Sequence, residues 1–140
     1  MRTLRGQTNP VLVDTSAWIC FFAKSGYVAV KAGLKNLLDS DQVATAGPIA
    51  LELLQGCRSS EEQAALEEKL KSLHWLSTQD QHWYTAGRLA FALRRKGVTV
   101  SAIDVLIATL AEDYGCALLQ RDSDFGLIAQ NTDLRLVEVK

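Results

Sequence analysis

Short apolar stretches that alternate with longer helical ones constrain the fold of this chain more than any other feature. The first apolar stretch, VLVD at residues 11–14, and the second, QVATA at 42–46, are too brief for helices. The residues between them, 15–41, contain two stretches with apolar side chains at helical spacing. Brief β-branched runs separated by helices predict a parallel sheet covered by helices. We therefore predict an α/β fold.

The rest of the chain continues this alternation. Further helices are expected at residues 47–56, 59–73, 79–97 and 101–111, further strands at 74–78, 116–120 and 134–139, and a loop with a short helix at 121–131. Serines suit the starts of two helices, with Ser16 as the expected cap of the first and Ser59 or Ser60 as the cap of the helix at 59–73. The chain has 140 residues and no linker, so we expect one domain.

The composition narrows the possible classes of protein. The net charge is −1 at pH 7, so no overall positive field predicts a histone-like binder or attachment to an anionic membrane. The three cysteines, Cys20, Cys57 and Cys116, are widely spaced, which favours reduced thiols in the cytoplasm over disulfides or structural zinc. Residues 17–23 form the longest apolar run, and residues 1–10 are polar, so we expect neither a membrane span nor a signal peptide.

Three acidic residues follow predicted strands. Asp14 ends the strand at residues 11–14, and Asp122 and Asp124 come directly after the strand at 116–120. In parallel α/β sheets, chemistry gathers just beyond the carboxyl ends of the strands. We therefore expect these carboxylates to lie at one edge of the sheet.

Two further acids lie on helices that are otherwise apolar. Glu52 is surrounded by leucines, so no orientation of its helix keeps it in water without exposing a leucine as well. Asp104 lies in SAIDVLIATLA, and its neighbours on the helix surface are Ala108 and Ala111. These small residues leave room around the carboxylate.

Each acid also has a purely structural interpretation. Ser101 and Asp104 have the spacing of a capping box, and an acid in the first turn complements the helix dipole. Asp14 suits a cap or a turn, Glu52 suits a partly exposed helix position, and Asp122 suits a loop. These interpretations do not explain why four such acids occur where a parallel sheet could bring them together.

Clustered carboxylates need a cation. Two of them about 4 Å apart repel each other by about 4 kcal/mol at an effective dielectric constant near 20. Protonation relieves a single pair, whereas three or four acids favour a divalent cation. Oxygen ligands without histidine or cysteine favour Mg²⁺, or Mn²⁺, over zinc. The chemistry typical of such a site is metal-assisted hydrolysis of a phosphodiester.

Four motifs together resemble the PIN domain, and in particular the VapC toxins of bacterial toxin–antitoxin pairs. They are VLVDTSAWI, IALELLQG, IDVLIATLA and LLQRDSDFGLIA, which occur in the family's order. The resemblance covers nearly the whole chain from Val11 onward. It implies a PIN domain over residues 11–140, with residues 1–10 as an N-terminal extension.

The resemblance implies a role for each matching acid. Asp14 in VDTS matches the first metal-binding acid, and Glu52 in LELLQG matches the second. Asp104 in IDVLIA matches the third, which with Asp14 is the usual magnesium pair. Asp122 in RDSDF matches the fourth, and Asp124 is its close companion. The four matching acids are also the expected catalytic residues.

Polar neighbours of the acids match the family only in part. Ser16 corresponds to a hydroxyl residue near the metal in many members. Gln120 departs from the pattern, because many members have threonine or serine two positions before the fourth acid. Arg121, next to Asp122, is the basic residue best placed to meet a substrate phosphate.

The resemblance implies a magnesium-dependent endoribonuclease toxin that cleaves structured RNA, either tRNA or ribosomal RNA. Members are often homodimers and are neutralised by a small VapB-like antitoxin, whose C-terminal segment lies in a groove near the active site. Two alternatives remain open. One is a PIN nuclease that processes RNA without a toxin role. The other is a non-catalytic α/β interaction module in which the acids serve as helix caps.

Other basic and aromatic residues carry weaker signals. Lys24, Arg58 and the RRK sequence at residues 94–96 could meet phosphates, although basic residues at a helix end more often complement its dipole. The aromatic residues of SAWICFF suit the core or a dimer surface better than a base-stacking platform, and could also line an antitoxin groove. His74 and His82 lie outside the motifs, so we assign them structural or surface roles.

Overall fold

The computed structural model describes residues 9–138, and residues 1–8 of the expected N-terminal extension lie outside this range. The strands are β1 (Val11–Val13), β2 (Val43–Ala46), β3 (His74–Leu76) and β4 (Leu118–Leu119). The helices are α1 (Thr15–Phe22), α2 (Val28–Asp39), α3 (Gly47–Gln55), α4 (Ser60–Lys71), α5 (Asp80–Arg95), α6 (Ala102–Asp113) and α7 (Ser123–Gln130). The alternation read from the sequence is therefore present.

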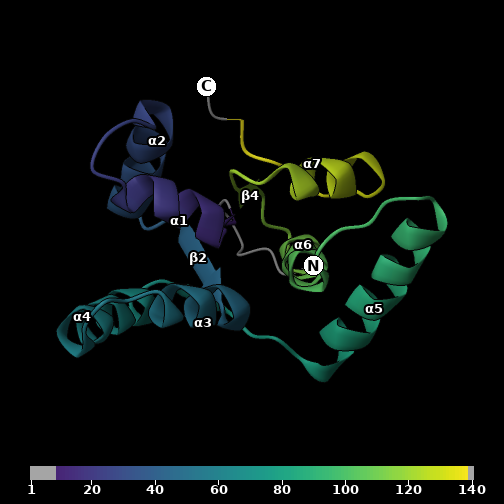
Figure 1. Ribbon diagram of the computed structural model, residues 1–140, viewed down its shortest axis with the longest axis horizontal. Coiled ribbons are helices and arrows are strands. Elements are labelled where there is room, and N and C mark those ends of the chain that lie inside the picture. Colours follow the sequence, from purple (N-terminus) through teal and green to yellow (C-terminus); the bar gives the residue numbers. More distant parts are fainter. Residues whose placement is uncertain (1–8, 139–140) are drawn as a thin grey trace.

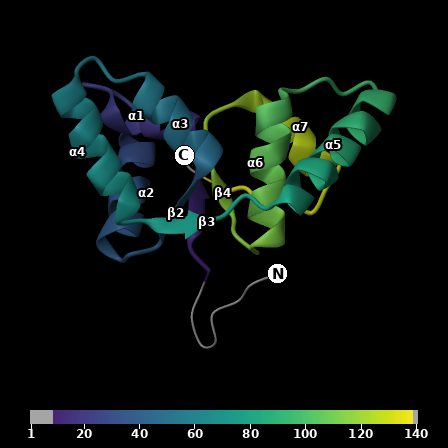
Figure 2. The ribbon, with the colours of Figure 1, turned by 90° about the horizontal axis from the view of Figure 1, so that it is seen from below.

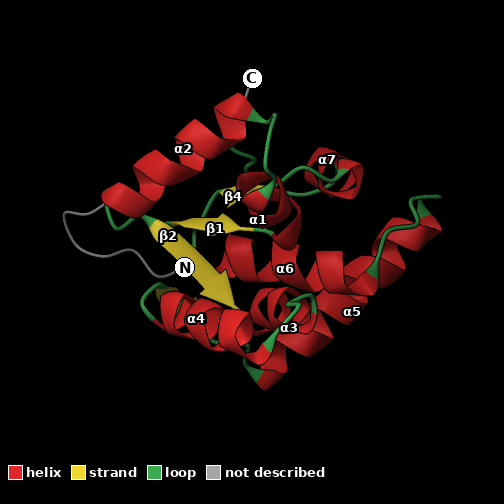
Figure 3. Cartoon of the chain, turned by 60° about the vertical axis from the view of Figure 1, so that its left-hand side comes forward, coloured by secondary structure: helices red, strands yellow, loops and turns green. Residues whose placement is uncertain are grey.

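The four strands form one parallel sheet in the order β3–β2–β1–β4. Figure 3 labels three of them, β2, β1 and β4. Leu12 at the centre of β1 pairs with Ala44 of β2 on one side and with Leu118 of β4 on the other. All three side chains are fully buried, because helices cover both faces of the sheet. The predicted α/β class is confirmed. Parallel strands place their carboxyl ends at one edge of the sheet, which is where the acids follow β1 and β4.

The helices lie in two groups on either side of the sheet. Figures 1 and 2 show α1 to α4 on one side and α5 to α7 on the other. Helix α6 is the central helix of the second group and contacts both α5 and α7. Residues 105–111 of α6 are all buried, which explains why aliphatic and small side chains occupy every face of this helix.

Two local expectations are wrong. The first helix begins at Thr15, so Asp14 rather than Ser16 is its N-cap, and the Asp14 side chain accepts a hydrogen bond from the backbone N–H of Ser16. In the described part of the predicted strand at 134–139, the chain forms a single bridge between Leu136 and Leu118. Strand β4 is only two residues long before the chain turns toward α7, so it offers little edge to pair with.

Two of the three cysteines and Trp18 of α1 lie inside the fold. All three cysteines are free, and Cys20 and Cys116 are buried. Trp18 is fully buried in the core, whereas Phe22 stacks on it and remains half exposed. No helix within residues 9–138 is long and apolar enough to cross a bilayer.

His82 has a structural role, as expected. Its ring is buried, and Nδ1 accepts a hydrogen bond of 2.9 Å from the backbone N–H of Gln79 at the start of α5. The other nitrogen, Nε2, therefore carries the proton and donates to Asp113 Oδ2 at 2.8 Å. Asp113 is the last residue of α6, so this imidazole joins the first turn of α5 to the end of α6.

We expect His82→Ala to lower the free energy of unfolding by about 2–3 kcal/mol, because a helix cap and a buried hydrogen bond are lost together. His74→Ala is the matched control, since the His74 side chain is 37% exposed, and should cost less than about 1 kcal/mol. Urea denaturation measures both. Equal effects of the two substitutions would contradict this role for His82.

Candidate active site

Three carboxylates meet at the carboxyl-terminal edge of the sheet. Asp104 lies in the first turn of α6, Asp122 is the N-cap of α7, and Asp124 lies in the first turn of α7. One carboxylate oxygen from each lies within 4.8 Å of the others. The structure therefore brings a helix acid predicted from its apolar surroundings next to two acids predicted from their position after a strand.

Asp14 is the most buried of the predicted acids, with 4% of its surface exposed. Its backbone N–H donates to Leu119 O, which ties the end of β1 to β4. The side-chain oxygen Oδ2 accepts both the backbone N–H of Ser16 at 2.9 Å and the Ser16 hydroxyl at 2.6 Å. The other oxygen, Oδ1, accepts no hydrogen bond from the described residues. Asp14 is thus both a helix cap and a buried carboxylate with one oxygen free.

Glu52 reaches the same region from α3. Its side chain is exposed, and the neighbouring Leu51 is 68% exposed, as expected for an acid on a largely apolar helix. The hydroxyl of Thr15 donates to Glu52 Oε1 at 2.9 Å. Sequence reasoning missed Thr15, although its place directly after Asp14 in VDTS was an available signal.

The electrostatics show that the other four acids act on Asp104. Desolvation by burial is the largest cause that raises the pKa of Asp104 to about 7, and the charges of Asp122, Asp14, Asp124 and Glu52 contribute to the same rise in that order. None of these acids forms a salt bridge with a lysine, arginine or histidine among residues 9–138. No cationic side chain in this part of the chain therefore pairs with them to offset their repulsion.

This donor set fits a divalent cation. The available ligands are carboxylate oxygens at close range, which Mg²⁺ and Mn²⁺ accept. Asp104, Asp122 and Asp124 are grouped closely enough to share one ion. Asp14 and Glu52 approach the group from β1 and α3 and contribute to its negative potential.

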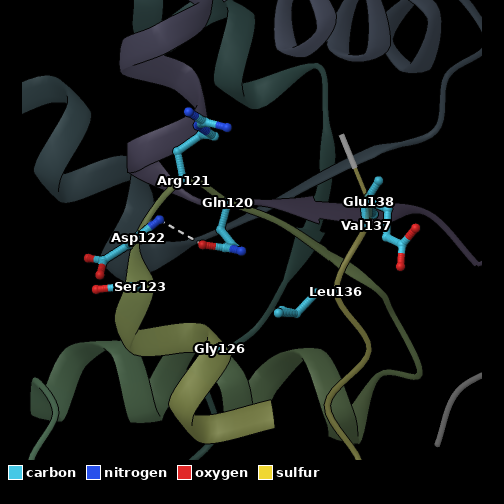
Figure 4. Close-up of a pocket in the computed structure, with 8 residues that line it drawn as sticks. All are labelled: Gln120, Arg121, Asp122, Ser123, Gly126, Leu136, Val137 and Glu138. Atoms are coloured by element: carbon cyan, nitrogen blue, oxygen red, sulfur yellow. Dashed lines mark hydrogen bonds between the residues drawn. The ribbon is translucent and has the colours of Figure 1, made fainter. Parts of the chain in front are cut away.

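Polar neighbours hold the acids in place through the backbone. The Ser16 hydroxyl donates to Asp14 and accepts the backbone N–H of Arg121 at 2.8 Å. It therefore links β1 to the segment that carries Asp122. Gln120, the residue that departs from the family pattern, accepts the backbone N–H of Asp122 through Oε1 at 2.7 Å (Figure 4).

The capping-box interpretation of Asp104 is not supported. Ser101 is the N-cap of α6, but its side chain makes no capping hydrogen bond. Asp122 is not an ordinary loop acid, because it is the N-cap of α7 and its Oδ1 accepts the backbone N–H of Asp124 at 2.9 Å. Capping and cluster formation coexist at Asp122, since a cap bond occupies only one carboxylate oxygen.

A groove of about 900 Å³ opens beside the acids. It runs between α1, α3 and α4, and Thr15 and Glu52 lie among its lining residues. Its apolar lining includes Ile19, Phe22 and Leu66. Its basic residues are Lys24, Arg58 and Lys69, of which sequence reasoning named the first two.

A second pocket, of about 660 Å³, lies on the α7 side of the acids. Figure 4 shows it between the segment at residues 120–123 and the segment at 136–138. The side chain of Arg121 points away from Gln120, on the opposite side of the backbone. The Arg121 side chain is exposed. The basic residues 94–96 lie at the end of α5 and line neither pocket.

Comparison with known proteins agrees with this fold. The profile of the PIN domain matches residues 11–131. The chain is 36% identical over 129 residues to a VapC ribonuclease of Mycobacterium bovis and to ribonuclease VapC11 of Mycobacterium tuberculosis, an alignment that covers 89% of this chain and 96% of each relative. The chain therefore belongs to the PIN domain family and, within it, to the VapC ribonucleases.

Solved structures show the same fold. The chain resembles VapBC2 of Rickettsia felis bound to a promoter DNA fragment with a TM-score of 0.74 and 20% identity, over 93% of this chain and 98% of that chain. It resembles VapC20 of Mycobacterium tuberculosis, described as a toxin that cleaves the sarcin–ricin loop, with a TM-score of 0.62 and 17% identity, over 83% of this chain and 92% of that chain.

We expect Asp104→Asn to stabilise the metal-free protein above about pH 7. The raised pKa means that the folded state holds a proton that the unfolded state has already released, so stability is lost as pH rises from about 4 to about 7. If the whole pKa shift is converted to free energy, ionised Asp104 lowers the free energy of unfolding by about 4 kcal/mol. Because the side chain is partly exposed to solvent, we expect a loss of about 1–2 kcal/mol. Denaturation in EDTA from pH 4 to 8 measures the difference.

The control is Asp133→Asn, which removes an exposed acid outside the cluster. It should change the free energy of unfolding by less than about 0.5 kcal/mol at every pH. A pH dependence that is the same in wild type and Asp104→Asn would contradict the electrostatic account of the cluster.

Proposed function

We propose that this protein is a Mg²⁺-dependent endoribonuclease and the toxin of a VapBC pair. The observation that carries the proposal is the group formed by Asp104, Asp122 and Asp124, each of which offers a carboxylate oxygen within 4.8 Å of the others. Within residues 9–138, no lysine, arginine or histidine forms a salt bridge with these three acids. Its relatives named as ribonucleases support the RNA substrate, which we propose to be structured tRNA or ribosomal RNA.

In this proposal Asp14, Asp104, Asp122 and Asp124 hold the ion, and Glu52 completes the acidic site. A bound Mg²⁺ ion supplies activation of a water molecule and neutralisation of charge on the phosphodiester. The chain's own contribution is positioning. Ser16 and the N-terminus of α1 orient the Asp14 carboxylate, and Thr15 orients Glu52 through its hydroxyl.

We expect Asp14→Asn and Asp104→Asn each to reduce cleavage of total tRNA by at least about 100-fold, the scale of losing one charge-stabilising group from an active site. EDTA should abolish cleavage by the wild type, and added Mg²⁺ or Mn²⁺ should restore it. Asp133→Asn is the matched control and should cleave at the wild-type rate. Cleavage that survives EDTA or the Asp104→Asn substitution would contradict the metal-dependent mechanism. Absence of both cleavage and metal binding in the wild type would favour the non-catalytic interaction module.

We further propose that the groove between α1, α3 and α4 binds the C-terminal segment of a small VapB-like antitoxin. Solved VapBC complexes that share this fold support such a partner. The groove combines apolar side chains with three basic residues and ends at Glu52 beside the acids. A peptide with apolar and acidic side chains fits this lining, and its occupancy would cover the approach to the active site.

Ile19→Asp should weaken antitoxin binding by at least about tenfold, because a carboxylate would be desolvated against the apolar lining. The Ile19 side chain is 62% exposed, so the fold should tolerate the change. Phe91→Asp is the control, since Phe91 is 59% exposed and lies on α5 outside the groove. Calorimetry with the small protein encoded immediately upstream measures both affinities. If no such reading frame exists, the RNA-processing alternative replaces the toxin role.

The proposal also includes an oligomeric state and a cellular location. We propose a homodimer, which is supported by large apolar side chains that the single chain leaves exposed, among them Leu51, Trp75 and Trp83. We also propose a cytoplasmic location, which is supported by the three free cysteines and by the RNA substrate.

A further inference from the structure

One exposed cation is fixed next to the acids by the backbone. Arg121 directly precedes Asp122, and its backbone N–H is held by the Ser16 hydroxyl, which also binds Asp14. The Arg121 side chain is exposed and forms no salt bridge with the described residues. The guanidinium lies over the ring of Tyr27, with 5.9 Å between Cζ and the ring centroid.

The structure gives no folding reason for a tyrosine at position 27. Tyr27 is the N-cap of α2 but makes no side-chain capping bond, and its φ of +56° is in the left-handed region. Within residues 9–138, the other non-glycine residue with positive φ is Asp41, a type that tolerates this conformation. The Tyr27 side chain is 49% exposed. A strained backbone that presents an exposed ring points to a function for the ring.

The pair has the chemistry of a nucleotide-binding platform. Unpaired RNA bases stack on aromatic rings and on guanidinium planes, and arginine binds phosphate. An RNA that approaches five acids needs a positive group close to the phosphate it presents. Neither Tyr27 nor Arg121 lines the groove assigned to the antitoxin, so this surface is available for substrate.

We propose that Tyr27 and Arg121 bind a nucleotide adjacent to the scissile phosphate, with its unpaired base stacked on the platform and its phosphate on the guanidinium. This inference rests on the proposed ribonuclease function and extends it by naming the residues that hold the RNA. The nucleotide must be single-stranded, because a paired base cannot reach the ring.

Tyr27→Asn separates this role from a structural one. Asparagine tolerates positive φ and is a better N-cap than tyrosine, so the melting temperature should be unchanged or higher. Loss of the ring should raise KM for tRNA cleavage in Mg²⁺ by about tenfold, the scale of one stacked base, and leave kcat within twofold. Tyr27→Phe keeps the ring and should restore KM.

Arg121→Ala tests the phosphate contact. The substitution should raise KM for tRNA cleavage. In tRNA binding measured in EDTA, it should also reduce the magnitude of the slope of log affinity against log salt concentration by about one. The matched controls lie on α5, Tyr84→Asn for the ring and Arg88→Ala for the charge, and both should leave KM within twofold. Their side chains are exposed and line neither the groove nor the pocket beside the acids.

The outcomes distinguish this inference from the proposed function. If the wild type cleaves tRNA and both Tyr27→Asn and Arg121→Ala leave KM unchanged, the inference is overturned and the proposed function stands. A loss confined to kcat, or a KM that Tyr27→Phe does not restore, would also overturn it. Wild-type protein that cleaves neither tRNA nor ribosomal RNA would overturn the proposed function and this inference together.

Discussion

Repulsion among five carboxylates at one edge of the sheet is the interaction on which the proposed chemistry depends. The parallel sheet brings Asp14 and Asp122 to this edge, and α6 and α3 add Asp104 and Glu52. Burial desolvates the Asp104 carboxylate, and this desolvation together with the charges of the other four acids raises its pKa to about 7. No cationic side chain from the described part of the chain pairs with these acids to offset the repulsion. The folded protein therefore maintains a site that favours a divalent ion.

The fold resists this repulsion through hydrogen bonds to backbone groups. Asp14 and Asp122 each accept a backbone N–H at the start of a helix, where negative charge is also favoured by the helix dipole. Ser16 joins the two segments, because its hydroxyl contacts Asp14 on one side and the N–H of Arg121 on the other. Buried α6 provides a rigid support for Asp104. These hydrogen bonds and the buried helix α6 hold the acids together against their electrostatic repulsion.

Hydrophobic patterning predicted most of the fold, because β1, β2 and β4 are largely buried and therefore need nearly continuous apolar runs. It failed at residues 134–139, where an apolar run has almost no strand edge to pair with. The five acids were identified from their strand-end or apolar settings. The Thr15 contact with Glu52 was not predicted, although Thr15 directly follows Asp14 in VDTS, because the two residues are 37 apart in the chain. The Tyr27 contact with Arg121 was not predicted because it joins residues 94 apart. Sequence periodicity carries no information about such contacts.

Metal binding by the acid cluster is the central claim, and Mn²⁺ titration followed by electron paramagnetic resonance tests it most directly. We expect at least one Mn²⁺ to bind per chain, with affinity that increases as pH rises through about 7, because binding requires Asp104 to be ionised. Asp104→Asn should weaken this binding by at least about tenfold. Absence of binding, or equal binding by wild type and Asp104→Asn, would contradict the account.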